Sequence, residues 1–421
     1  MVTRTEIIDG MQFTFLKGKD AINTTDAAAH TFTYQYAGTS APVDLPTSAT
    51  YDGWSDFSAA AEASFREGLD HLESLINVEF VEVTGSDDPD MNVGSVTLPG
   101  STAGTGGYSA SSSGDSITRY DSYVVYDNTI DISTTMDLIL HELGHAMGLK
   151  HSFSSPTVPD GFDNNKYTLM SYTENPDNGL DSDAMMLFDI LALQDLWGAN
   201  DETALGDTTY TGSRTETIDA VWDAGGIDTF DGSALSGGVK LDLREGRFSS
   251  FETTDDVVIA YDTVIENAIG GDGTDKLVGN SAANNLLGGA SRDKLKGGSG
   301  GDDIDGGAGR DKINGGRGRD DLSGGAGNDR ISGDKGKDTL TGNGGADTFV
   351  FENKGGKDRV LDFKDDVDQL KFDHADVSSV DDVLALGTEK NGNAFFTFSD
   401  GLIVRVDDIT LAELSNDILI A

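Results

Sequence analysis

The sequence of 421 residues contains no cysteine and has far fewer basic than acidic residues. Without cysteine no disulfide can form, so an extracellular form needs another kind of cross-link, and metal ions are the obvious substitute. There are 29 Lys and Arg against 74 Asp and Glu, which gives a net charge of −45. This balance argues against nucleic acid and anionic membranes as partners, since both need positive patches. It fits a protein that binds many divalent cations through carboxylates.

Long apolar stretches are also missing. None approaches the roughly 18 residues of a membrane-spanning helix, so no membrane span is expected. The first residues, Met1 to Asp9, lack the apolar core of a secretory signal. The protein is therefore expected to be either cytosolic or exported by another route. Its length predicts two or three domains.

A compact histidine motif, H-E-x-x-H-x-x-G-x-x-H, runs from His141 to His151. His141 and His145 are four residues apart and share one face of a helix, where two imidazoles can take adjacent corners of a zinc tetrahedron. Glu142 adjoins the first ligand, where a carboxylate can polarise a metal-bound water. Gly148 permits positive φ, so the helix can end and His151 can reach a third corner. The motif predicts a catalytic zinc site with one open position.

A second landmark is a nine-residue period, G-G-x-G-x-D-x-U-x with U apolar, over residues 270–350. Each unit predicts a glycine-rich turn whose carbonyl and Asp oxygens bind Ca²⁺, then a three-residue strand with its apolar side chain inward. One unit buries almost nothing, so stacking must form the core. Position six is Asn284 in one unit and otherwise Asp275, Asp293, Asp302, Asp311, Asp320, Asp329, Asp338 and Asp347. The apolar slot holds Leu277, Leu286, Leu295, Ile304, Ile313, Leu322, Ile331, Leu340 and Phe349.

Periodicity and turn signals predict the other elements. Helices are expected from Ser55 to Ile76, from near Thr134 through the histidine motif with Asp137 in a capping box, and from Ala184 to Trp197 as core packing. Before the motif, strands are expected at Thr31–Tyr36, Val78–Val83, Met91–Leu98 and Tyr123–Tyr126, with a Gly/Ser-rich loop up to Asp115. After it, short strands are expected at Ala220–Trp222, Val239–Leu243 and Val257–Tyr261, and a hairpin at Ala394–Phe398 and Leu402–Val406.

Met170 lies downstream of the histidine motif where a Met-turn is expected, and Tyr172 follows two residues later. Together with the repeats, these residues resemble the serralysin-type metzincins of the M10 family, bacterial zinc endopeptidases that carry an RTX calcium-binding β-roll. Three more segments are similar to family segments in the family's order, namely Trp197–Asn200, Val221–Thr229 and Ile265–Gly271. The resemblance covers about residues 50–421.

The resemblance implies an α+β metzincin catalytic domain followed by an all-β parallel β-roll. It implies one catalytic Zn²⁺ on His141, His145 and His151, with Tyr172 as a mobile ligand and Glu142 as general base. It also implies several structural Ca²⁺ ions in the repeats and near Asp223, Gly225, Asp228 and Glu266, where the sequence is similar to a calcium-binding turn.

On this reading the chain has three parts: a leader or possible pro-segment (residues 1–45), the zinc metalloprotease domain (46–200) and the β-roll with a C-terminal cap (201–421). A loosely attached arm is an equally good interpretation of the first part. The family is exported by type I (ABC-transporter) machinery that reads the C-terminus, and Asp417–Ala421 is similar in kind to such signals. The resemblance thus implies a secreted, extracellular monomer that hydrolyses protein and peptide substrates.

A second hypothesis is a calcium-responsive RTX binding or toxin-like protein whose N-terminal domain only recognises a partner. The complete set of three histidines and a base argues against it, because binding alone does not require the base. Proteolysis of a generic protein, with and without a zinc chelator, separates the two hypotheses.

Overall fold

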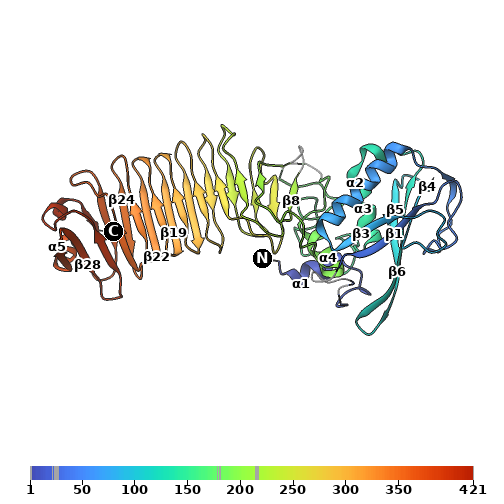
Figure 1. Cartoon of the computed structure of the whole chain (residues 1–421), viewed down its shortest axis with the longest axis horizontal. Helices are drawn as coiled ribbons and strands as arrows, with labels where there is room; N and C mark the ends of the chain where they lie inside the picture. Colours follow the sequence, from blue (N-terminus) through green and yellow to red (C-terminus); the bar gives the residue numbers. More distant parts are fainter. Residues whose placement is uncertain are drawn as a thin grey trace. The chain divides into compact units, whose positions relative to one another are not determined.

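The computed structural model describes residues 2–20, 22, 28–177, 179, 182–213 and 218–420 (Figure 1). The chain forms two compact units. Unit 1 comprises Met1–Leu205, Ser213–Ala224 and Ala260–Thr263, and unit 2 comprises Gly206–Gly212, Gly225–Ile259 and Val264–Ala421. None of the helices in the described ranges has the length and apolar character that a membrane crossing requires.

Unit 1 is built on a sheet with the strand order β3-β1-β4-β6-β5, in which β2 also pairs with β4. β1, β3, β4 and β6 run parallel, and β5 runs antiparallel to β6. The predicted strands near residues 31, 78 and 91 are confirmed to within one residue. The bounds are β1 (His30–Tyr36), β2 (Asp52–Ser55), β3 (Val78–Glu82), β4 (Met91–Thr97), β5 (Gly104–Ser113) and β6 (Ser116–Asp127).

The predicted glycine- and serine-rich loop before Asp115 is wrong. Most of it forms β5, and β6 is much longer than the predicted Tyr123–Tyr126. Gly and Ser have low strand propensity, but continuous pairing of β5 with β6 outweighs that preference. Because β5 ends the strand order, its outer edge has no partner strand in the described part of the chain.

Four helices accompany this sheet: α1 (Arg4–Met11), α2 (Ala59–Leu75), α3 (Met136–Ala146) and α4 (Leu187–Trp197). α2 begins after Ser58, whose hydroxyl caps it, because Ser55 already belongs to β2. The predicted capping box before α3 is wrong. Thr135 is the N-cap but makes no side-chain cap hydrogen bond, and Asp131 instead caps a 3₁₀ turn, η1 (Ile132–Thr134).

The first residues of the chain pack into unit 1. Ile7, Met11 and Leu16 are buried. The Lys150 amide donates to the Met11 carbonyl (2.8 Å), and the buried Lys150 ammonium donates to the Gly10 carbonyl (2.5 Å). The interpretation as a loosely attached arm is therefore wrong for residues 2–20.

Unit 2 is a parallel β-roll. Within the nonapeptide repeats, each strand residue pairs with the residue eighteen positions later, as Leu277 does with Leu295 and Leu286 with Ile304. Two nonapeptides therefore make one turn, and alternate repeats enter two different sheets. All nine predicted apolar slots are buried. The eight-stranded sheet contains β10 (Lys240–Asp242), β14 (Lys276–Val278), β16 (Lys294–Ser299), β19 (Lys312–Gly318), β22 (Arg330–Gly336), β24 (Thr348–Glu352), β26 (Gln369–Asp373) and β30 (Ile418–Ile420).

The eleven-stranded sheet is parallel except at β27-β28-β29, where the predicted hairpin is confirmed. In strand order it contains β27 (Gly387–Lys390), β28 (Asn393–Thr397), β29 (Ile403–Val406), β25 (Lys357–Val360), β23 (Thr339–Thr341), β20 (Asp321–Ser323), β17 (Asp303–Asp305), β15 (Asn285–Leu287), β13 (Asn267–Ile269), β9 (Thr229–Asp231) and β7 (Thr209–Tyr210). The remaining elements are β8 (Asp219–Val221), β11 (Phe248–Ser249), β12 (Val257–Ile259), β18 (Ala308–Gly309), β21 (Ala326–Gly327), α5 (Val380–Ala385) and η2 (Glu413–Asn416).

Candidate active site and calcium-binding turns

The histidine motif forms the predicted helix and turn. His141 and His145 lie on α3, and the chain turns at Gly148, which has φ +103°. A Cβ there would lie 2.7 Å from Leu16 Cδ1, so both the backbone and the packing require glycine. The turn brings His151 back to the two helix histidines.

The three imidazoles converge on one point. His151 Nε2 lies 3.2 Å from His141 Nε2 and 3.1 Å from His145 Nε2. Nδ1 of His141 donates to the Leu169 carbonyl, and Nδ1 of His145 donates to the Leu149 carbonyl, both at 2.9 Å. Because a carbonyl only accepts, each Nδ1 carries the ring proton and each Nε2 presents a lone pair. Facing lone pairs repel unless a cation lies between them, so this donor set fits a zinc ion.

Burial keeps these imidazoles neutral. It lowers the pKa of His145 to about 3 and that of His151 to about 4, and the neighbouring His141 ring adds to both shifts. Burial also lowers the pKa of His141 itself. Neutral imidazole is the form that binds metal, so the site is set up for a metal at neutral pH.

Glu142 is buried beside the histidines, at 6% exposure. Its Oε2 has no hydrogen-bond partner among the described residues. Burial raises its pKa to about 7, with the backbone of Gly106 opposing the shift. A carboxyl group with such a pKa can accept and return a proton near neutral pH.

The edge strand β5 lies directly against this carboxylate. A Cβ at Gly104 would lie 2.8 Å from Glu142 Cγ, and one at Gly106 would lie 2.1 Å from the Glu142 carbonyl oxygen. Glycine at these two positions therefore allows the strand to approach α3. The run that was predicted as a loop thus forms one wall of the site.

Met170 and Tyr172 also reach the site. A Cβ at Gly144 would lie 2.7 Å from Met170 Sδ, so the methionine packs tightly against α3. Tyr172 Oη lies 2.8 Å from His151 Nε2, and the residue is 69% exposed. The tyrosine ring contacts the rings of His141, His151 and Phe153, and the residue is otherwise exposed.

One positioning residue was not predicted. Asp189 lies on α4, which was expected to provide core packing only. Its buried carboxylate accepts from the Leu169 amide (2.7 Å), the Met186 amide (2.9 Å) and the Thr168 hydroxyl (2.6 Å). It therefore fixes Leu169, whose carbonyl orients His141. The only sequence signal was an acidic residue among the apolar residues of the first half of the helix.

A cavity of about 640 Å³ opens beside these groups. The start of β5 lines it through Gly104, α3 through His141 and Glu142, and the segment after Met170 through Ser171 and Tyr172. All of these residues belong to unit 1. The cavity gives a bound molecule direct access to the histidines and the carboxylate.

The aspartates of the nonapeptides form two ladders in unit 2. The Asp293 amide donates to Asp311 Oδ1 (2.8 Å), and the Asp302 amide donates to Asp320 Oδ1 (3.0 Å). The second carboxylate oxygen, Oδ2, is buried and has no hydrogen-bond partner among the described residues in seven repeats, at Asp293, Asp302, Asp311, Asp320, Asp329, Asp338 and Asp347. Such oxygens are costly to bury without a cation.

The turns offer these oxygens a second ligand. A Cβ at Gly306 would lie 2.5 Å from the Gly324 carbonyl oxygen and 2.8 Å from Asp311 Oδ2, so both oxygens face the same space. Burial raises the pKa of Asp293 to about 7 and that of Asp302 to about 6. Hard oxygen ligands of this kind fit Ca²⁺.

Two predicted positions differ from the others. Asp275 is the first repeat aspartate, and its Oδ2 accepts from the Gly271 amide (2.7 Å). Asn284 stands where an aspartate is otherwise found, and its Oδ1 accepts from the Asn280 amide (2.8 Å). Neither position contributes an unpartnered carboxylate oxygen.

Two further aspartates extend the ladders and were not predicted. The Asp338 amide donates to Asp358 Oδ1 (3.3 Å), and the Asp347 amide donates to Asp368 Oδ1 (2.9 Å). Their spacings of 20 and 21 residues break the period of 18 and so conceal them. The local signal was the Asp-x-apolar pattern, which both positions keep.

The four residues expected near the start of the roll are divided between the units. Asp223 lies in unit 1, where its amide donates to Thr263 Oγ1 (3.2 Å). Gly225, Asp228 and Glu266 lie in unit 2, where the Asp228 amide donates to Glu266 Oε2 (2.8 Å). The structure therefore brings Asp228 and Glu266 together.

Three converging histidines that could hold a metal ion lie in unit 1, and unit 2 is a parallel β-roll with acidic turns. The family described as Peptidase M10 serralysin C terminal matches residues 189–400. The chain belongs to this serralysin family.

Curated relatives agree with this assignment. Metallopeptidase AprA of Pseudomonas marginalis is 32% identical over 282 residues, which cover 55% of this chain and 56% of that protein. Serralysin A of Dickeya chrysanthemi is 36% identical over 258 residues, 54% of each chain, and serralysin of Photorhabdus laumondii is 32% identical over 267 residues, 55% of each. The chain thus spans about half the length of the curated relatives it matches.

Proposed function

We propose that this protein is a zinc-dependent endopeptidase that hydrolyses peptide bonds in protein substrates. The observation that carries the proposal is the convergence of three Nε2 atoms beside the buried, unpartnered Oε2 of Glu142. A zinc ion on His141, His145 and His151 would supply Lewis-acid polarisation of the scissile carbonyl and of the attacking water. The names of the relatives support a peptidase.

Glu142 is the general base. Its carboxylate takes a proton from the attacking water and later passes that proton to the leaving amine. Burial supports both steps, because the raised pKa of about 7 lets the group exchange a proton near neutral pH. The Gly104 and Gly106 backbone holds the carboxylate from one side.

Tyr172 is proposed to act as a mobile group. Its hydroxyl, 2.8 Å from His151 Nε2, is close enough to join the metal ligands when no substrate is present. Its high exposure leaves it free to swing away and donate a hydrogen bond to the oxyanion of the tetrahedral intermediate. Asp189 is a positioning residue, because it acts on His141 through Leu169.

The substrate main chain is proposed to extend β5 as an additional strand. β5 ends the sheet and lines the cavity that contains His141 and Glu142. Edge addition supplies main-chain hydrogen bonds whatever the substrate sequence, which suits an endopeptidase with many protein substrates. All proposed catalytic groups lie in one unit of one chain, so a monomeric enzyme is sufficient for the proposed chemistry.

The roll is proposed to bind several structural Ca²⁺ ions through the repeat aspartates. The seven unpartnered Oδ2 atoms support this assignment. Calcium is abundant outside cells and scarce inside, so a calcium-dependent roll supports an extracellular enzyme that folds after export by type I machinery. Proposed calcium binding near Asp223, Gly225, Asp228 and Glu266 rests on the family resemblance.

Substitution of the base tests the proposed catalysis. Glu142→Ala should abolish casein hydrolysis, because the variant loses the proposed base beside the histidines, while zinc stays bound at the unchanged histidines. Hydrolysis and zinc content are measured on the same calcium-loaded preparation. Casein hydrolysis at the wild-type rate by Glu142→Ala would sink the assignment.

A further inference from the structure

The eight-stranded sheet of the roll carries a column of cations. Strand register places Lys276, Lys294, Lys312 and Arg330 in successive pairs on the neighbouring strands β14, β16, β19 and β22. Adjacent strands lie about 4.8 Å apart, and like charges directly opposite each other are destabilising. None of the four has an acidic partner within ion-pair distance among the described residues. The column therefore costs stability, and no ion pair with a described residue offsets that cost.

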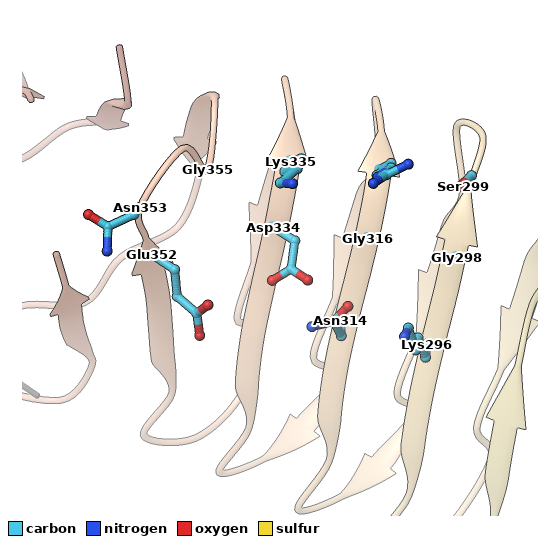
Figure 2. A pocket seen from close by; sticks show the side chains of 11 residues that line it. Lys296, Gly298, Ser299, Asn314, Gly316, Asp334, Lys335, Glu352, Asn353 and Gly355 are labelled. Atoms are coloured by element: carbon cyan, nitrogen blue, oxygen red, sulfur yellow. The ribbon is translucent and has the colours of Figure 1, made fainter. Parts of the chain in front are cut away.

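A shallow cavity of about 290 Å³ lies on three of these strands, β16, β19 and β22, and on the next strand, β24 (Figure 2). Its floor includes Gly298 and Gly316, which pair across β16 and β19 and leave the sheet surface without side chains. Lys296, Arg317 and Lys335 line it and are exposed. Together with the column they give seven cations over four strands of a chain whose net charge is −45.

The other sheet of the roll has the opposite charge at the equivalent positions. There Asp303 pairs with Asp321 across β17 and β20, where the eight-stranded sheet has lysines, and Asp305 follows on β17. From β15 to β23 the strands of that sheet carry no lysine or arginine. Along these successive turns of the roll the strand cations therefore lie on one sheet, which is not the random scatter of a solvated surface.

We infer that the face formed by β14, β16, β19 and β22 binds an acidic polysaccharide with an anionic group on each sugar. A linear chain of this kind repeats its charges at a spacing comparable to that between neighbouring strands, so consecutive sugars meet consecutive cations. Asp334, Glu352 and Asn314 also line the cavity and can accept hydrogen bonds from sugar hydroxyls. The face combines anion recognition with hydroxyl recognition.

Other occupants fit less well. Single-stranded nucleic acid is generally held by aromatic side chains on which bases stack, and β14, β16, β19 and β22 contain no aromatic residue. The carboxylates of a second copy could pair with the cations, but a carboxylate cannot donate hydrogen bonds to Asp334, Glu352 and Asn314 as sugar hydroxyls can. The inference does not depend on peptidase activity, since all of these residues lie in unit 2.

Binding of chondroitin sulfate to the full calcium-loaded chain tests the inference, with neutral dextran as the control polymer. Chondroitin sulfate should bind by isothermal titration calorimetry and dextran should not. Lys294→Gln with Lys312→Gln should weaken binding roughly tenfold and flatten its salt dependence, because two anion contacts are lost. Lys357→Gln with Lys390→Gln removes the same charge from exposed positions on the eleven-stranded sheet and should leave affinity unchanged.

Several results would overturn the inference. These are absence of chondroitin sulfate binding, equal binding by the Lys294/Lys312 variant, tighter binding of a single-stranded DNA through the same lysines, or wild-type self-association that this variant abolishes. Equal calcium-dependent melting of all variants establishes that the roll is intact. Lys294→Arg with Lys312→Arg should retain binding, because the charge is kept.

Discussion

At the scale of single residues, burial is the common cause of the site's chemistry. It keeps His141, His145 and His151 neutral, as metal binding requires, and it raises the pKa of Glu142 to about 7. The backbone carbonyls that accept from two of the rings then fix which nitrogen faces the proposed metal. Burial in one environment thus raises the pKa of the carboxyl group and lowers the pKa of the imidazoles.

Tyr172→Phe tests the role of the tyrosine hydroxyl. The variant should lose roughly ten- to a thousandfold in kcat for casein hydrolysis, because one donor to the oxyanion is removed. Zinc content should stay at the wild-type level, since three histidines remain. Metal analysis and initial rates measure both quantities. A large loss of bound zinc with a normal rate per remaining zinc would contradict the proposed role.

The residues of the histidine motif could be predicted because their spacing within eleven residues expresses the geometry directly. Asp189 could not, since it acts through Leu169, which lies twenty positions away in the chain. Asp358 and Asp368 were hidden because insertions break the repeat just before them. Spacing in the sequence predicts ligands that lie close together in the chain, whereas contacts between distant segments can be seen only in the folded structure.

At the scale of elements, the contact between β5 and α3 forms one wall of the cavity that contains Glu142. The sequence of β5 is rich in Gly and Ser and has no apolar alternation, so nothing in it indicated a strand. Its glycines instead allow close packing against α3 at Glu142. The loop prediction therefore failed at β5, where the proposed site requires glycines that a strand would otherwise disfavour.

Gly106→Ala should damage this contact. Its Cβ would lie 2.1 Å from the Glu142 carbonyl oxygen, which is backbone and cannot move aside cheaply. We expect a loss of stability of about 1–3 kcal/mol, typical of overpacking, and a casein hydrolysis rate reduced by roughly tenfold or more as the base is displaced. Thermal melting and initial rates check both effects.

Ser111→Ala is the matched control, because Ser111 is exposed on the same strand. It should behave as the wild type in both assays. Normal activity in Gly106→Ala would show that β5 does not hold Glu142.

At the scale of the whole molecule, the repeats carry the proposed dependence of stability on calcium. The nine-residue repeat is visible in the sequence, and it predicted both the buried apolar positions and the acidic turns. The division of alternate repeats between two sheets of unlike charge emerged from the register of 18. The difference in charge between the two sheets depends on which strands become neighbours when the repeats stack, and a single repeat does not contain that information.

The roll should respond to pH in opposite directions with and without calcium. Without calcium, the pKa of Asp293 is raised to about 7 and that of Asp302 to about 6. A carboxyl group whose pKa rises on folding destabilises the fold once it is deprotonated. The calcium-free roll should therefore gain stability as pH falls through those values, from about 8 towards about 5.

The calcium-loaded roll should instead lose stability over the same range, because protons compete with calcium for the same oxygens. Melting temperatures in chelator and in excess calcium across this range measure the two trends. Parallel trends in both conditions would contradict calcium binding by these aspartates.

The most direct test of the central claim is a zinc titration of chelator-stripped protein in calcium buffer, followed by casein hydrolysis. The three-histidine site predicts that stripping abolishes hydrolysis, and that activity returns linearly and stops rising at one zinc per chain. Full activity in the stripped protein, or no activity at any zinc concentration, would contradict the claim that this chain is a zinc endopeptidase.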